Sequence, residues 1–418
     1  MALTAARAKS AQQALISIFF IQGIVGLTYI PRIPELIKNI NVEYATWGLI
    51  IGVAGLGALL GLLFTNRFIS RFGTRRVVIF GAAFQSLFIA TLGLIHNPIL
   101  FFVASAAMNF AGATVNIALN SQTVALQKAL NKVVIGRFHA AWSIGAATST
   151  GLSAVLVTFM PLWLHLLLIP GMGIACLFYF GRGLLLSSED GHGDKRTVVN
   201  KIPFLKSPPQ VWLLAAGLFT GVFTELALMD WSSVYAKTEL GLSLGLAAIP
   251  FTAFSSAMII GRLLIGRLTK KRHISELARV SGIYGSVCLV SAVVLGALLR
   301  DSNETLALIV VSILFVGVGL GSASMVPSFF SGAGYVKGLN TAQVLARMSL
   351  VNQVLIMVAK IAMGGLAQGV GLSIAFLLPT ITLFAAGVIA GFVAKRARHN
   401  EAASNAVPPT GAMGIIAE

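Results

Sequence analysis

The chain has 418 residues, of which 57% are hydrophobic and only 10% charged, and it contains 43 glycines. Soluble domains carry about 25% charged residues, so this chain has too few charges to cover a surface in water, and its abundant glycine is typical of closely packed transmembrane helices. The formal charge of +17 is spread in short clusters between apolar stretches, which indicates a membrane protein with a lipid bilayer as its solvent and argues against nucleic acid as a partner.

Twelve apolar stretches are long enough to cross a bilayer, which takes about 20 helical residues. We predict spans at residues 12–30, 46–65, 77–96, 99–119, 138–159, 161–180, 210–230, 246–266, 277–299, 305–330, 343–367 and 371–394. No small-residue cleavage site closes the first stretch, so we expect no cleavable signal peptide. With the N-terminus inside, 24 Lys and Arg residues fall on inner segments and 4 on outer loops. The positive-inside rule therefore predicts cytoplasmic termini, in a multi-pass protein of the cell (inner) membrane.

A polar, basic loop containing "SSEDGHGDKRTVVNK" divides the spans into two sets of six. The sets resemble each other, because "GLLFTNRFISRF" from Gly61 is matched 200 residues later by "GRLLIGRLTKKR" from Gly261, and each links the second and third spans of its set. The prediction is an all-α membrane protein with twelve transmembrane helices in two pseudo-symmetric six-helix bundles, an architecture usual in secondary transporters. Its predicted parts are an N-terminal bundle (1–180), a cytoplasmic central loop (181–209), a C-terminal bundle (210–396) and a disordered cytoplasmic tail (397–418).

The sequence carries no sign of catalysis. Cys176 and Cys288 both lie inside apolar stretches, where they are expected to serve as small packing residues and not as a disulfide or metal site. The chain has no Walker-type phosphate loop and no constellation of catalytic side chains. We therefore expect no cofactor, no metal and no enzymatic activity.

Polar residues recur at helical spacing in the first and fourth spans. Gln22 and Tyr29 are seven residues apart, and the fourth span carries Asn109, Asn116 and Asn120, which fall within about 40° of one another on a helix. A polar stripe in a membrane is costly unless it faces a cavity or a neighbouring helix. We expect these residues to line a solute pathway; hydrogen bonding between helices is the alternative.

The eleventh span repeats this pattern with Ser349, Gln353 and Lys360. At the start of the fifth span lie His139 and Trp142. His139 is expected to be solvated at a helix end, although His is also a natural proton carrier. Trp142 is a candidate for stacking on a ring-shaped solute, and a packing or interfacial aromatic is the alternative.

The loop between the second and third spans reads "NRFISRFGTRR". It resembles the signature of the major facilitator superfamily, roughly G-x-x-x-D-R-x-G-x-R-R, and the resemblance extends over residues 10–395. The loop residues it singles out are Asn66, Arg67, Arg71, Gly73, Arg75 and Arg76. Three further stretches, "YIPRIP", "RFHAAWSIG" and "ELALMDWSSVY", resemble a bacterial branch of permeases distantly similar to fucose permeases. The resemblance implies a transporter of small molecules.

The signature departs from the family at two positions. Ser70 stands where the family usually has Asp, and Asn66 replaces the leading Gly. In the family that carboxylate is thought to latch the cytoplasmic side, so here other contacts are expected to do so, such as Asn66 or helix-end dipoles. Gly73 is expected to supply a positive φ for the tight turn between two antiparallel helices.

Two acids stand at the end of the seventh span, Glu225 and Asp230. Being five residues apart on a helix, they point about 140° away from each other. We expect Asp230 and Trp231 at the outer interface, with Asp230 meeting Arg32 of the first outer loop in an outer gate; two separately solvated charges are the alternative. Exposed pairs of this kind contribute about 0–1 kcal/mol.

Glu225 is expected deeper in the membrane, at the depth of Lys360 to within roughly 3 Å. A carboxylate whose cationic partner approaches and recedes would take up and release a proton, so Glu225 and Lys360 are the predicted proton-coupling site; a permanent ion pair is the alternative. The sequence thus predicts a secondary active transporter of a small polar or amphipathic solute, driven by protons, acting as a monomer by alternating access. The alternatives are proton-coupled drug or metabolite efflux and a membrane sensor that retains the fold without transport.

Overall fold

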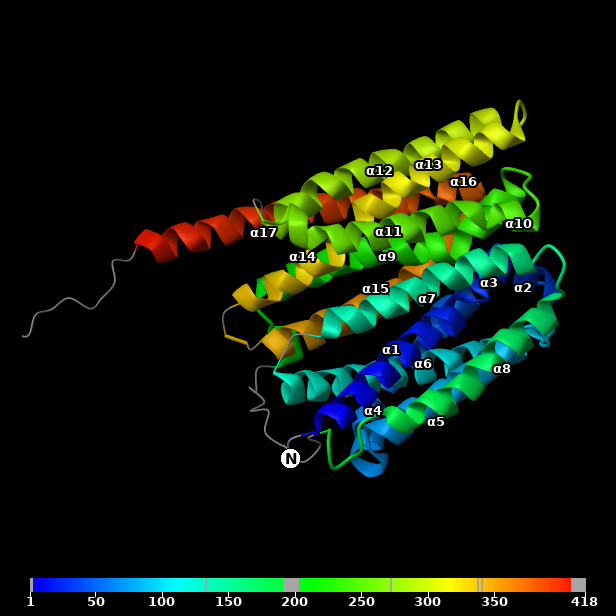
Figure 1. The fold of residues 1–418 in the computed structure, drawn as a ribbon. Helices are drawn as coiled ribbons and strands as arrows, with labels where there is room; N and C mark the ends of the chain where they lie inside the picture. The colour runs from blue at the N-terminus through cyan, green and yellow to red at the C-terminus, as the bar shows by residue number, and fades with distance from the viewer. Residues whose placement is uncertain are drawn as a thin grey trace, which may run out of the picture.

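The computed structural model describes residues 3–131, 134–190, 203–270, 273–336, 338–339 and 341–406. Within these ranges every regular element is a helix. The first half of the chain comprises α1 (Ala5–Leu27), η1 (Ile30–Arg32), α2 (Ile33–Asn39), α3 (Tyr44–Val53), α4 (Gly55–Phe72), α5 (Thr74–Leu92), α6 (Pro98–Leu130), α7 (Ile135–Leu156), α8 (Leu162–Phe180) and η2 (Gly181–Gly183). Two bundles of long helices result (Figure 1), and the first half forms one of them.

The second half forms the other bundle (Figure 1). It comprises η3 (Phe204–Lys206), α9 (Pro209–Thr238), α10 (Leu244–Ala247), α11 (Ile249–Leu268), α12 (Ile274–Leu299), α13 (Glu304–Ser322), α14 (Met325–Gly332), η4 (Ala333–Tyr335), α15 (Thr341–Val370), α16 (Leu372–Ala375) and α17 (Leu377–Ala406). The first helix starts and the last helix finishes at the same end of the molecule, which we call the termini end; the opposite end is the far end.

The twelve-helix prediction is confirmed. In the described part of the chain, eleven helical stretches are long and apolar enough to cross a membrane. The twelfth is α7, which has 22 residues but is more polar. Its polar groups are used against α1, because Ser149 donates to the Ile24 carbonyl at 2.6 Å and Ser153 to the Thr28 carbonyl at 2.9 Å. Hydroxyls bonded in this way join membrane helices without an unpaired polar group.

Several helices extend beyond the predicted spans. The predicted seventh span ends at residue 230, but α9 continues to Thr238. The eleventh was predicted to end at 367, and α15 continues to Val370. The tail expected to be disordered from residue 397 is helical as far as Ala406, and residues 407–418 lie outside the described part. Sequence hydropathy underestimates these lengths because helices continue past the apolar core into polar residues.

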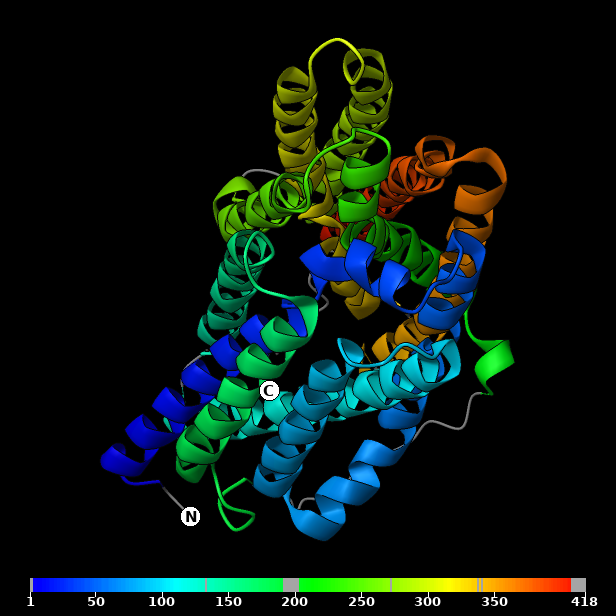
Figure 2. The same ribbon diagram turned by 90° about the vertical axis from the view of Figure 1, so that its right-hand side faces the viewer.

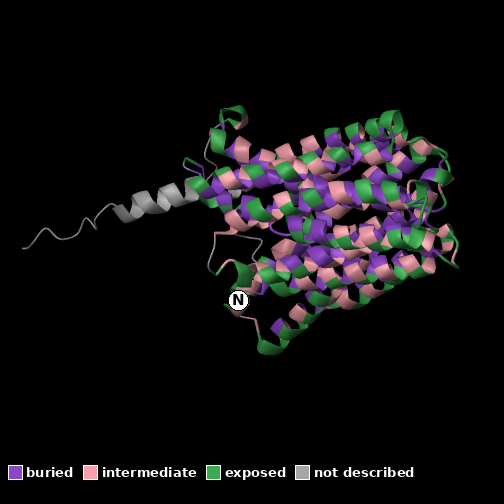
Figure 3. Ribbon diagram, turned by 90° about the horizontal axis from the view of Figure 1, so that it is seen from above, coloured by how far each residue is buried: buried purple, intermediate pink, exposed green. Residues whose placement is uncertain are grey.

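The two bundles meet most closely at the far end. There η1 and α2 contact α9, α10 contacts α7, and α3 packs along α15. Viewed from the far end, α2 crosses between the bundles (Figure 2). Buried residues follow the inward helix faces, whereas exposed ones occupy the periphery (Figure 3). Exposed positions include large apolar side chains such as Leu63, Phe80 and Ile313, which is the pattern expected of a protein surrounded by lipid.

Candidate transport site

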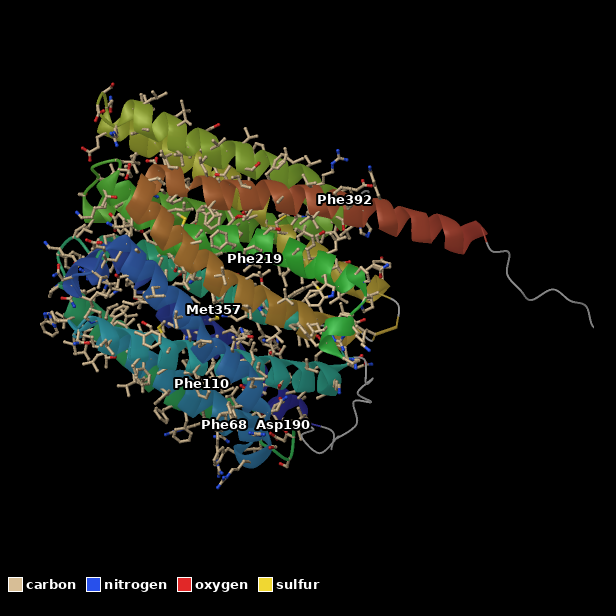
Figure 4. All side chains as sticks on the ribbon, turned by 180° about the vertical axis from the view of Figure 1, so that it is seen from behind. Phe68, Phe110, Asp190, Phe219, Met357 and Phe392 are labelled. Carbon is tan, nitrogen blue, oxygen red and sulfur yellow. The ribbon has the colours of Figure 1, made fainter. Side chains whose placement is uncertain are left out.

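A cavity of about 220 Å³ lies between the two bundles. Its polar lining comes from both: Tyr29, Trp47, Ser105 and Asn109 from the first half and Asp230, Gln353 and Lys360 from the second. The rest of the wall is apolar or aromatic, and includes Met357 of α15, which is labelled in Figure 4. The wall of this cavity therefore contains five residues that the sequence analysis named as candidates: Tyr29, Asn109, Asp230, Gln353 and Lys360.

An ion pair forms part of the cavity wall. Lys360 Nζ lies 2.7 Å from Asp230 Oδ2, and the two side chains are only 15% and 7% exposed. The pair joins α15 to α9 within the second bundle. A charge held away from water is strongly disfavoured unless it is compensated, so each member of the pair requires the other.

The pairing of Lys360 with Glu225 predicted from the sequence is wrong for this conformation. Asp230 occupies the depth that was assigned to Glu225, because α9 runs eight residues beyond Asp230 to Thr238. Lys360 stands ten residues before Val370, the last residue of α15. At 1.5 Å per residue these two depths differ by about 3 Å. Asp230 is therefore buried in the cavity wall and is not a solvated residue at a helix end.

Glu225 has a different partner. Its Oε2 accepts a hydrogen bond from Arg262 of α11 at 2.8 Å, and both side chains are partly exposed, at 26% and 31%. Glu225 lies about 7.5 Å from Asp230 along the helix axis, towards the termini end. The sequence prediction that the two acids do not form a carboxylate pair agrees with this, since each faces a different helix.

The predicted gate between Arg32 and Asp230 is also absent from this conformation. Arg32 is 1% exposed and binds Glu35 at 2.6 Å and the Met160 carbonyl at 2.8 Å. Both partners belong to the first bundle. The physical reason is local: η1 leads directly into α2, so Glu35 lies one turn beyond Arg32 and captures its guanidinium.

A buried histidine completes the Arg32 network, and the sequence reading missed it. Arg32 lies 3.2 Å from His165 Nδ1, and His165 Nε2 lies 3.0 Å from Thr28 Oγ1. Because Arg32 can only donate, Nδ1 must accept, so Nε2 carries the hydrogen and donates to Thr28. His165 is fully buried. A lone His inside an apolar stretch was the only sequence signal for it.

The far end of the cavity is closed by contacts between the bundles. The Tyr44 amide of α3 donates to Gln368 of α15 at 3.1 Å, and the Tyr44 ring meets Trp231 edge-on at 5.7 Å between centroids. Trp231 is fully buried within the protein, and its place at the depth of the outer membrane interface stays a prediction. Next to them α3 and α15 approach so closely at Gly48 and Gly364 that a Cβ on Gly48 would lie 2.7 Å from the Gly364 Cα.

The remaining pathway candidates lie away from the cavity wall. Asn116 is exposed and Asn120 partly exposed on α6, joined by a hydrogen bond of 3.0 Å from Asn120 to Asn116. They continue the Asn109 face towards the termini end. Ser349 is partly exposed on α15, on the termini side of Gln353. Gln22 is buried, and Trp142 is partly buried against the core.

A sequence profile described as the Major Facilitator Superfamily matches residues 15–335. The chain belongs to the major facilitator superfamily. An uncharacterised transporter of this superfamily from Yersinia pestis is 25% identical over 362 residues, covering 86% of this chain and 89% of the relative. An uncharacterised transporter from Sinorhizobium fredii is 28% identical over 373 residues, covering 88% of this chain and 93% of the relative. This is a family of membrane transporters that carry small solutes.

Solved structures show the same major facilitator fold. A mutant of the nucleoside transporter NupG aligns with a TM-score of 0.74 at 10% identity, covering 92% of this chain and 98% of that chain. A bacterial homologue of the human lysosomal transporter Spinster, in an inward-facing and occupied conformation, aligns with a TM-score of 0.67 at 13% identity, covering 94% and 98%. The narrower resemblance to fucose permeases stays a prediction.

The superfamily signature loop has the predicted turn. Gly73 has φ +78°, which a residue with a Cβ adopts only with strain, and an added Cβ would also meet the Ser187 side chain. Arg71 and Arg76 are exposed at the termini end, and Arg75 is half-buried. Their neighbours Asn66 and Arg67 are exposed as well.

Contacts at the termini end fix the start of the central loop to the first bundle. Gln122 of α6 donates to Thr74 at 2.6 Å and to the Leu185 carbonyl at 2.8 Å. Arg7 of α1 binds Glu189 at 2.7 Å, and this hydrogen bond lowers the pKa of the Glu189 carboxyl. These residues lie far apart in the sequence, so no local pattern pointed to them.

Proposed function

We propose that this protein is a secondary active transporter that moves a small polar or amphipathic solute together with protons by alternating access. The observation that carries the proposal is the cavity between the bundles, closed at the far end and lined by the Asp230–Lys360 ion pair. Buried ionisable groups inside a membrane protein typically mark a solute or proton pathway.

The orientation follows from the distribution of basic residues. With both termini in the cytoplasm, as the positive-inside rule predicts, the termini end faces the cytoplasm and the far end faces outwards, in the cell inner membrane. The contacts of Tyr44 with Gln368 and Trp231 then close the outer side. The exposed face of α6 carrying Asn116 and Asn120 leads from the cavity towards the inside.

The cavity favours a small solute. Its volume of about 220 Å³ is below the 300–1,000 Å³ range of sites for drug-sized ligands. Its wall combines the rings of Trp47 and Phe101 with the polar groups of Asn109 and Gln353. Such a lining suits a solute that has both an apolar body and hydrogen-bonding groups.

We assign proton coupling to Asp230, with Lys360 as its partner. Protonation of Asp230 removes the charge that compensates Lys360, so the proton and the solute become linked through one pair of side chains. Glu225, the acid assigned to coupling from the sequence, is bound to Arg262 outside the cavity wall. We therefore expect it to secure α9 to α11.

The test uses the full-length protein in proteoliposomes that carry a pH-sensitive dye. Candidate solutes of anionic, neutral and cationic classes are added under an imposed pH gradient, and coupled transport appears as solute-dependent proton movement. Asp230→Asn is expected to abolish accumulation against a gradient while leaving solute exchange. Glu225→Gln, five residues away on the same helix, is the matched control and is expected to retain accumulation. Unchanged accumulation by Asp230→Asn would remove Asp230 from the coupling role.

A further inference from the structure

The residues that line the cavity carry two charges, and these cancel. Asp230 and Lys360 are the charged residues among those lining it, and they face each other at 2.7 Å. The empty cavity therefore has no net charge. Since an uncompensated charge is strongly disfavoured at this depth, the solute and the proton together should also leave the cavity without net charge.

We infer that the solute is a small organic monoanion, of the carboxylate class, and that it is carried with one proton in an electroneutral symport. The inference rests on the proposed function and names its substrate class. A proton from solvent binds the Asp230 carboxylate, Lys360 is released from Asp230, and the Lys360 ammonium binds the carboxylate of the solute. On the other side of the membrane the solute leaves, the proton leaves Asp230, and the ion pair forms again.

The other solute classes leave a net charge in the cavity. A neutral solute carried with a proton leaves Lys360 unpaired and the cavity at one positive charge. A cation that takes the place of the proton at Asp230 likewise leaves the cavity positive, because Lys360 remains charged. With an anion and a proton, both the loaded and the empty cavity are neutral, which is the arrangement least disfavoured by a low-dielectric interior.

A second donor for a carboxylate lies in the same wall. Trp47 is 2% exposed and lines the cavity, and its Nε1 has no hydrogen-bond partner among the described residues. A buried donor without a partner is unfavourable, and an acceptor on the solute would satisfy it. Trp47 precedes Gly48, which packs against the Lys360 backbone. A carboxylate accepts hydrogen bonds only, so it suits the two donors, Lys360 and Trp47.

Of the titratable groups near Asp230, Lys360 is the one positioned to pair either with Asp230 or with the carboxylate of the solute. Lys360 from α15 and Tyr29, which directly precedes η1, share the cavity with Asp230. Among the charged groups on other elements packed against α9, Arg32 of η1 pairs with Glu35, and Arg262 of α11 pairs with Glu225.

The experiment compares matched ligands on the purified full-length protein. Thermal stabilisation is measured with lactate and benzoate, with their amides lactamide and benzamide, and with benzylamine. At least one carboxylate is expected to stabilise the protein, with an apparent affinity at least tenfold above that of its amide. Because one proton is taken up with the carboxylate, the apparent affinity should fall by about tenfold for each unit by which the pH rises in the range where Asp230 is ionised. If neither carboxylate exceeds its amide, or if benzylamine binds better, the inference is overturned.

Two variants of the same ion pair should behave in opposite ways. Asp230→Asn imitates the protonated acid, so it is expected to bind the carboxylate with no pH dependence. Lys360→Gln is expected to lose carboxylate binding, and Trp47→Phe to weaken it by about tenfold at unchanged pH dependence. A melting curve without ligand checks that each variant folds, and the neutral double variant D230N/K360Q, which is also expected to lose carboxylate binding, replaces Lys360→Gln if that variant does not fold. If Asp230→Asn loses as much carboxylate binding as Lys360→Gln, or as the double variant used in its place, the ion pair has only a structural role.

Proteoliposomes separate this inference from the proposed function. If a neutral or cationic solute drives proton movement that depends on Asp230, the proposed function stands and the anion inference falls. If a carboxylate drives proton movement at a rate that a membrane potential set with potassium and valinomycin does not change, both stand. If no class of solute drives proton movement, both fall.

Discussion

Closure of the far end depends on two glycines, and one added methyl group should loosen it. A Cβ on Gly364 would lie 2.6 Å from the Tyr44 carbonyl oxygen and 2.7 Å from the Gly48 Cα, whereas ordinary contacts lie at 3.4–4 Å. The neighbouring residue Gly365 has nothing within 4 Å of the position a Cβ would take. Gly364→Ala therefore forces α3 and α15 apart, and Gly365→Ala is a control on the same helix with the same change in composition.

The size of the effect follows from how far these distances lie below an ordinary van der Waals contact. The backbones must separate by the better part of 1 Å, and overpacking of this order costs about 1–3 kcal/mol. Because the strain exists only while the far end is closed, it shifts the equilibrium towards far-end opening by about 5- to 150-fold. Both substitutions gain the same helix propensity, about 1 kcal/mol for Gly to Ala, so their difference isolates the contact.

Labelling of a cavity residue measures this shift. Met229 lines the cavity, and Met229→Cys is made in a chain whose two native cysteines are replaced by Ala. With the proposed orientation, the rate of reaction with a membrane-impermeant maleimide, added to intact cells, reports opening of the far end. Gly364→Ala is expected to raise the rate at least about fivefold, and Gly365→Ala to leave it unchanged. Equal rates in the two variants would refute the assignment of these glycines to closure of the far end.

Three further changes test contacts at the two ends of the first bundle. The Arg7 bond lowers the pKa of Glu189, so its stabilisation, about 1 kcal/mol, is fully present above the unfolded pKa and is lost as pH falls through the folded pKa; the melting difference between wild type and Glu189→Gln should shrink from pH 6 to pH 3. Gly73→Ala should lower stability by at least about 1–2 kcal/mol in denaturant melts, because φ is +78°, and a change within error would contradict it. His165→Ala removes the groups facing Arg32 and Thr28 and should cost about 1–3 kcal/mol by the same measurement; an unaltered melting curve would show that this network adds no stability.

The fold was accessible from the sequence because the membrane restricts it so strongly. Only helices satisfy every backbone group in lipid within one segment, so an apolar stretch of sufficient length predicts a helix almost by itself. The most polar of the predicted spans, residues 138–159, forms the full helix α7. Its Ser149 and Ser153 hydroxyls bond to α1, and a hydropathy scale counts them as unfavourable because it does not include the neighbouring helix.

The partners of the charged residues were less accessible. Choosing a partner for Lys360 required its depth to within one helical turn, and the error of eight residues at the end of α9 exceeded that. The sequence predicted a partner for Arg32 in the opposite bundle because Arg32 and Asp230 were both expected at the outer side, whereas Arg32 pairs with Glu35, a carboxylate three residues away. Trp47 and His165 gave no sequence signal beyond an aromatic and a His in apolar surroundings.

The angle between Glu225 and Asp230 explains why one helix can carry two acids with different roles. Five residues turn an α-helix by about 140° beyond a full turn, so Asp230 meets Lys360 of α15 in the cavity while Glu225 meets Arg262 of α11. The two acids lie about 7.5 Å apart along the helix axis. At the depth of Asp230 the ion pair is buried, with side chains 7% and 15% exposed, whereas at the depth of Glu225 both partners are 26–31% exposed. In an ion pair that water reaches, each charge is stabilised only a little by its partner, so losing the partner costs little. In the buried pair, each charge depends on the other for its stability. In the proposed function, only the second arrangement can link the binding of a proton at Asp230 to the release of the Lys360 ammonium, a linkage that proton-coupled transport by alternating access requires.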